Sequence, residues 1–130
     1  MMDLHIQGET SVQARRRLEA GYKELRNQRI MELFTMIVYG TPVDTGQARG
    51  GWRVATSEVE WPQNTLDPDG SATIAAAWAA LQNIHHWANV YISNGEPHIG
   101  ALEHGHSGQA PVGIVRVQLP AFRAMHGDVL

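Results

Sequence analysis

The spacing of apolar residues along the first third of the chain predicts one long helix. Apolar side chains recur every three or four positions between residues 11 and 39. The members of this stripe are Leu18, Tyr22, Leu25, Leu33 and Met36. Thr10 or Ser11 is the expected N-cap, and Gly40, with Pro42 two positions later, is expected to end the helix as a C′ glycine. A helix of about 28 residues would be ~42 Å long.

The character of this predicted helix changes along its length. Residues 30–39 are apolar on nearly every side, which is typical of a buried helix. Residues 12–29 are polar around most of the circumference, so we expect residues 10–29 to project from the core or to lie on a partner. The connector that follows, residues 41–46, has turn composition, and Gly46 is expected to adopt a positive φ.

The second half of the chain alternates between strand and helix patterns. Residues 52–57 alternate, with Trp52 and Val54 on the buried face. A loop at 62–70 leads to a helix, capped by Ser71 or Thr73, that ends near Ile84. Its apolar face is expected to contain Ile74, Ala77, Trp78 and Leu81. Residues 87–93 predict a strand before an Asn-Gly turn, and residues 1–8 a short edge strand.

The last segment, residues 112–123, fits two patterns. Val115, Val117 and Leu119 alternate as in a strand. Other apolar residues of the segment are spaced three and four apart behind Pro111, which is typical of a helix, although Pro120 would break or kink that helix at a cost of ~3 kcal/mol. The pattern leaves both structures open.

Together these elements predict an α+β fold in a single domain spanning residues 1–130. The long N-terminal helix and two shorter helices would pack on a small, mainly antiparallel sheet. The residues expected to be most deeply buried lie on the apolar faces of three successive elements. They are Leu33, Ile37, Trp52 and Trp78.

Composition narrows the classes of protein that this chain can represent. The 130 residues are 43% apolar and 18% charged, which is enough to form a core. The absence of cysteine excludes disulfides, thiolate metal sites and a cysteine nucleophile, and it fits assembly in a reducing cytoplasm. Apolar runs are far shorter than the ~20 residues of a transmembrane helix, so we expect no membrane association. No signal peptide is visible at the start of the sequence.

The charge is distributed unevenly. Residues 15–29 contain six of the ten basic residues and carry a net charge of +4, whereas the remainder of the chain carries −7. This polarity predicts contacts with acidic neighbours, including other copies of the chain, although a solvated helix face is the plain alternative. The expected charged members of that interface are Arg15, Arg16, Arg26 and Arg29.

Only one stretch has a composition suited to chemistry. Glu103, His104 and His106, with His98 nearby, could supply ligands to a metal such as zinc, but a loop whose histidines only pack or cap is the more ordinary interpretation. The sequence has no paired acid and base, nucleophile elbow or phosphate loop. We therefore expect no enzyme activity and no cofactor. A small His/Glu metal-dependent enzyme and a nucleic-acid binding module using residues 15–29 remain the alternatives.

Two stretches carry a resemblance to a known family. The first is residues 41–54 (TPVDTGQARGGWRV), directly after the long helix, and the second is residues 90–116 (VYISNGEPHIGALEHGHSGQAPVGIVR). With the intervening helix they cover most of residues 30–123. They resemble the tailed-phage neck and tail-component family of small proteins that join head to tail, also described as tail-completion, tail-terminator or minor tail proteins. Family members often have an aromatic residue where His98 and His104 stand here.

The resemblance implies a non-enzymatic structural protein of the virion, assembled in the host cytoplasm. It implies a ring-forming α+β homo-oligomer at the neck or tail end, bound to other neck, connector or tail-tube proteins. Genome DNA would pass through the ring without sequence-specific binding. The resemblance also favours a helix over a strand for residues 111–123. The loop containing His98, His104 and His106 would contact a neighbouring subunit.

Overall fold

The computed structural model of the chain describes residues 8–43, 46–58, 66–104 and 113–127. The expected strand at 1–8 and the connector residues 44–45 therefore lie almost wholly outside the described residues. The elements are α1 (Ser11–Gly40), α2 (Gln47–Gly50), β1 (Trp52–Ala55), α3 (Ser71–Gln82), β2 (Tyr91–Asn94), α4 (Ile99–Glu103) and α5 (Val115–His126). The predicted α+β class, with a long N-terminal helix and an antiparallel sheet, is confirmed.

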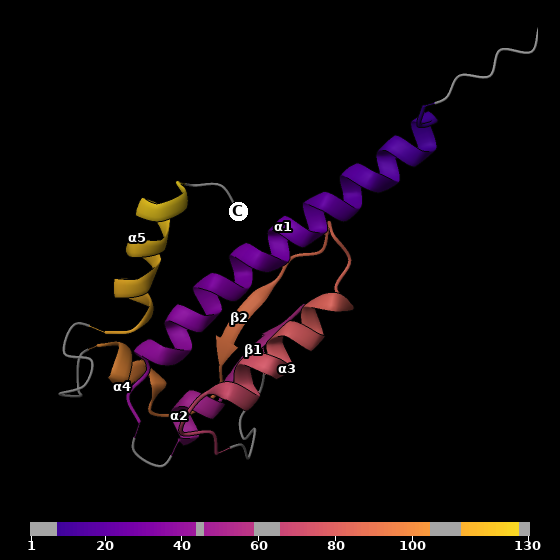
Figure 1. The fold of residues 1–130 in the computed structure, drawn as a ribbon. Coiled ribbons are helices and arrows are strands. Elements are labelled where there is room, and N and C mark those ends of the chain that lie inside the picture. The colour runs from indigo at the N-terminus through magenta and orange to yellow at the C-terminus, as the bar shows by residue number, and fades with distance from the viewer. Residues whose placement is uncertain (1–7, 44–45, 59–65, 105–112, 128–130) are drawn as a thin grey trace, which may run out of the picture.

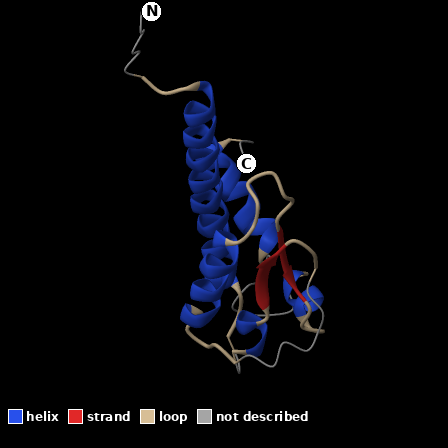
Figure 2. Cartoon of the chain, turned by 90° about the vertical axis from the view of Figure 1, so that its right-hand side faces the viewer, coloured by secondary structure: helices blue, strands red, loops and turns tan. Residues whose placement is uncertain are grey.

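The long helix α1 is the axis around which the other elements are arranged. Figure 1 shows α5 on one side of α1, and α3 with the two-stranded sheet on the other. The N-terminal turns of α1 extend beyond all of these elements (Figure 2). The C-terminal half of α1 is therefore covered from two directions, while none of the described elements covers its N-terminal end.

The first turn of α1 is closed by a capping box. The Thr10 hydroxyl accepts a hydrogen bond from the Gln13 amide at 3.1 Å, and the Gln13 side chain accepts one from the Thr10 amide at 3.0 Å. The helix has 30 residues. We had expected Gly40 to be a left-handed C′ glycine, but it is the last helical residue. Thr41 follows in an extended conformation and donates its amide to the Val38 carbonyl.

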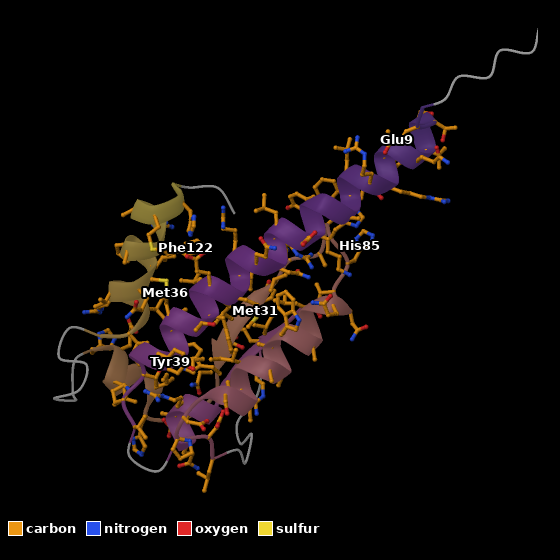
Figure 3. The ribbon with its side chains drawn as sticks, in the orientation of Figure 1. Glu9, Met31, Met36, Tyr39, His85 and Phe122 are labelled. Atoms are coloured by element: carbon orange, nitrogen blue, oxygen red, sulfur yellow. The ribbon has the colours of Figure 1, made fainter. Side chains whose placement is uncertain are left out.

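The core lies where α1, α3, α5 and the sheet meet. Figure 3 shows Met36 and Phe122 between α1 and α5. The buried apolar side chains of α1 all lie within residues 30–39, as predicted, although Tyr39 is 55% exposed. Leu33, Ile37 and Trp52 are buried as expected. Trp78 is not: its side chain is 45% exposed, so the prediction of a buried Trp78 is wrong.

The error over Trp78 reflects which face of α3 is buried. Thr73, Ala77 and Leu81 are the buried residues of this helix, so the buried face is rotated relative to the one that apolar spacing predicted. Thr73 can be buried because Asp67 accepts hydrogen bonds from its amide and its hydroxyl, both at 2.7 Å. Because its polar groups are hydrogen-bonded, Thr73 occupies a core position that apolar spacing would assign to an apolar residue.

The carboxylates of Asp67 and Asp69, which precede α3, accept hydrogen bonds from the first amides of the helix. Gly70 is the N-cap, whereas Ser71 or Thr73 had been expected in that position. Asp69 accepts hydrogen bonds from the amide and hydroxyl of Ser71, and these bonds lower its pKa below the usual value. Together with buried Asp67, Asp69 places negative charge at the positive end of the helix dipole.

Gly46 makes the turn that brings the chain from α1 into the sheet. Its φ of 86° confirms the predicted left-handed conformation. The Gly46 carbonyl accepts hydrogen bonds from Gly50 at 2.8 Å and from Asp67 at 3.1 Å, so the turn also holds the loop before α3. The four-residue helix α2 that begins at Gln47 was not predicted from the sequence.

The sheet is a single antiparallel pair. Trp52 lies opposite Asn94 and Ala55 opposite Tyr91. Trp52 and Val54 face the core, as the alternation predicted. β2 begins at Tyr91 rather than at residue 87, because the preceding segment forms turns against α1.

The C-terminal segment that fitted both a strand and a helix is the helix α5, which continues through Pro120. Its N-terminus is capped from a distance by Glu103. The Glu103 carboxylate accepts hydrogen bonds from the amides of Ile114, Val115 and Arg116 at 3.0, 2.7 and 2.8 Å. One side chain therefore satisfies most of the free amide groups at this helix end.

Candidate interaction surface on the long helix

The basic residues on the outer turns of α1 form ion pairs along the chain. Arg15 contacts Glu19 at 2.9 Å, and this hydrogen bond lowers the pKa of Glu19. Arg17 contacts Glu9 at 2.6 Å, at the tip of the molecule labelled in Figure 3. Exposed pairs of this kind add little stability. They nevertheless reduce the unpaired positive charge that the sequence indicated.

Arg26 was predicted to be an interface residue, and the structure assigns it an intramolecular position instead. Its guanidinium donates to the carbonyls of Ile84 and His85 and to the Asn27 side chain, and the residue is only 8% exposed. Lys23 donates to the Gln82 carbonyl at 2.7 Å. Lys23 therefore caps the last carbonyl of α3, and Arg26 holds the turn that follows the helix.

Removing the Arg26 side chain should therefore destabilise the fold. Arg26→Ala leaves the Ile84 and His85 carbonyls without their donor, and we expect the free energy of unfolding to fall by about 2–3 kcal/mol. Arg16→Ala, which removes an exposed arginine of the same helix, is the control and should change little. Urea denaturation of both variants tests this expectation, and equal stability of the two would contradict it.

Two of the four predicted interface arginines, Arg15 and Arg16, are exposed. They lie on the exposed turns, whereas Arg29 is half-buried and 3.8 Å from Glu32. Within the part of the chain that the structure describes, only Arg16 of the six basic residues at 15–29 has no polar partner. A phosphate backbone needs several uncommitted cations, so this arrangement does not favour the nucleic-acid alternative.

The outer half of α1 carries apolar side chains that nothing in the described chain covers. Leu18 is 63% exposed, Leu25 47% and Tyr22 41%. Trp87, in the segment after α3, is 69% exposed, and its ring lies 5.2 Å from that of Tyr22. The three residues of α1 lie in the part of the helix that was expected to project or to lie on a partner. The sequence identifies these residues as apolar, but it does not show that the neighbouring elements end before they reach them.

The two adjacent histidines after α3 attach this segment to α1. The rings of His85 and His86 stack with centroids 4.2 Å apart, and His86 Nε2 lies 3.9 Å from Glu19 Oε1. His85 is visible beside α1 in Figure 3. Both histidines lie beyond the helix, since α3 ends at Gln82, two residues before the predicted end near Ile84. From Glu19 onward α1 is thus held by the body, and only the turns before it project.

The residues proposed as metal ligands do not converge. His98 is exposed, His104 contacts Arg116 at 3.0 Å, and Glu103 caps α5. His106 lies outside the described residues. Among the residues that the structure describes, no three histidine or carboxylate side chains are grouped as metal ligands. In the described part of this stretch, Glu103 therefore serves as a helix cap and His104 makes a surface contact.

Glu103 offers a direct test of this structural role. Glu103→Ala should lower the free energy of unfolding by about 1–2 kcal/mol, because three amides at the start of α5 lose their acceptor. Hydrogen exchange should accelerate first in α5. His98→Ala, at an exposed position nearby, is the control. Unchanged exchange of the α5 amides in the Glu103 variant would refute the capping role.

Comparison of the chain with protein-family models, with curated proteins and with solved structures found no match. Within the described residues, no helix has both the length and the apolar character needed to cross a bilayer.

Proposed function

We propose that this chain is a structural virion protein of a tailed phage, forming part of the neck or of the head-proximal end of the tail. In this role it is a ring subunit, bound to neck, connector or tail-tube proteins. It does not act as an enzyme. The two sequence stretches that resemble the tailed-phage neck and tail-component family are the basis of the proposal.

The observation that carries the proposal is that these two stretches form one structural unit. Residues 41–54 include the first three residues of β1, residues 90–116 contain β2, and the two strands pair antiparallel. Asn94 of the second stretch donates to the Ala48 carbonyl of the first at 2.7 Å. Within the second stretch, Glu103 reaches forward to cap α5. Motifs far apart in the sequence therefore support a single fold, as expected of one family signature.

The uncovered end of α1 supports an assembly role. Its exposed turns carry Arg15 and Arg16 beside apolar side chains, and a helix of this kind has few intramolecular contacts to stabilise it. Contacts with another protein of the particle would supply them. The interface predicted from the sequence is retained for Arg15, Arg16 and Arg29, and Arg26 is withdrawn from it.

A triple variant tests this function. Arg15, Arg16 and Arg29 are each replaced by Glu, and the encoding phage is scored for heads joined to tails. We expect separate heads and tails to accumulate, because opposite charges at an interface determine orientation and association rate. The control places three new glutamates on exposed α3 positions, Ala75, Ala76 and Ala79. Normal joining in the arginine variant, with its circular dichroism unchanged, would contradict the proposal.

A further inference from the structure

The face of α1 that α5 covers continues beyond the end of α5, and no described residue of the chain packs over that continuation except Trp87 at its edge. α5 packs along α1 as far as Glu32, whose carboxylate lies 2.8 Å from His126 Nε2. The next outward positions on the same face, at spacings of three and four, are Arg29, Leu25, Tyr22 and Leu18. We call Leu18, Tyr22 and Leu25, together with Trp87, the α1 stripe.

The α1 stripe has the composition of a binding surface. Its four side chains are 41–69% exposed, and Tyr22 and Trp87 lie against one another with their ring centroids 5.2 Å apart. Large aromatic residues flanked by arginine are enriched among the residues that contribute most binding energy at protein interfaces. Isolated exposed apolar residues are ordinary, but here Leu18, Tyr22 and Leu25 fall on consecutive turns of one face, and Trp87 lies against Tyr22.

We infer that the α1 stripe binds an amphipathic helix of a different protein, with apolar residues on one face and carboxylates at its edges. The helix would lie along α1 in line with α5 and continue the packing that α5 begins. Arg15 and Arg29, which contact Glu19 and Glu32 within α1, lie at the two ends of the stripe. Acidic residues about four turns apart on the partner would therefore face them. This binding mode is a helix laid on an apolar face.

A second copy of this chain fits the stripe poorly. Two α1 helices paired antiparallel through Leu18 and Leu25 would bring Arg15 of each copy close to Arg29 of the other, which is repulsive. The other described surfaces offer little negative charge: after α1, the exposed carboxylates within the described ranges are Glu58 and Asp69. Asp69 is occupied by Ser71. The charges therefore favour a partner of another sequence.

The inference stands on the geometry of α1 and does not depend on the proposed virion function. It can be tested with the full chain and a synthetic helical peptide. The peptide is about four turns long, with leucines at positions i, i+4 and i+7 and glutamates along both edges. A second peptide has lysine in place of every glutamate. Fluorescence anisotropy of the labelled peptides measures binding.

The acidic peptide should bind at least about tenfold more tightly than the basic one. The double variant Leu18→Glu and Leu25→Glu should weaken binding of the acidic peptide by at least about tenfold. Leu66→Glu is the matched control, because Leu66 is 64% exposed, like Leu18, but lies outside the stripe. It should leave binding unchanged.

Three outcomes would overturn the inference. The first is equal binding of the two peptides, which removes the charge argument. The second is an equal loss of binding in the stripe variant and in the Leu66 variant, which shows that the peptide binds exposed leucine without preference. The third is concentration-dependent self-association, seen by analytical ultracentrifugation and abolished by the stripe variant. That result would identify a second copy as the occupant.

Discussion

Trp52→Ala is expected to lower the free energy of unfolding by about 3–5 kcal/mol, one of the two largest effects we foresee. The side chain is 5% exposed and lies at the centre of the core, and its indole N–H donates to the Thr41 hydroxyl at 2.8 Å. That hydroxyl in turn donates to the Ile37 carbonyl at 2.7 Å. Truncation therefore leaves a cavity and removes a link between the sheet and the end of α1.

Urea denaturation of the Trp52 variant should be compared with that of Trp78→Ala. Trp78 is 45% exposed on α3, and its truncation should cost far less. Trp52→Phe, which keeps most of the apolar volume and loses the hydrogen bond, should fall between the two. If Trp52→Ala and Trp78→Ala unfold at the same urea concentration, the core has been placed wrongly.

Gly46→Val is expected to cost about 3 kcal/mol or more, for two independent reasons. A β-branched residue tolerates the φ of 86° poorly. A Cβ at this position would also lie 2.6 Å from the Pro68 backbone nitrogen, which is too close to be relieved by a side-chain rotation. The turn must then open, and the loop before α3 loses the hydrogen bond between Asp67 and Gly46.

The same substitution at Gly21 is the control for this prediction. Gly21 lies within α1, where a Cβ would meet no atom within 4 Å. Valine is a somewhat better helix former than glycine, so Gly21→Val should leave stability the same or raise it slightly. Thermal denaturation monitored by circular dichroism compares the two. A Gly46 variant as stable as the Gly21 variant would show that the turn imposes no such constraint.

Much of the fold could be predicted because its signals are local. The hydroxyl cap at Thr10, the alternation around Trp52 and the turn at Gly46 each depend on neighbouring residues alone. α3 shows the limit of such signals. Its buried face includes Thr73, which is acceptable in the core only because distant Asp67 satisfies it. Apolar spacing therefore selected a face that included Trp78.

The candidate site was harder to predict, because it depends on where elements end in space. The positive charge of Arg26 suggested a partner protein, yet the guanidinium donates to the carbonyl of Ile84, just after α3 and 58 residues away in sequence. Leu18 and Leu25 matched the apolar stripe of a packed helix, but α5 reaches only as far as Glu32. Apolar spacing shows which helix positions can be buried, but it does not show how far the neighbouring element extends along the helix.

The most direct test of the proposed function is electron microscopy of intact particles of the encoding phage, with this chain fused to a compact tag and the density difference localised. Our account predicts tag density in a ring at the joint between head and tail, and separate heads and tails when the chain is deleted. Normally joined particles that lack the chain altogether would contradict it.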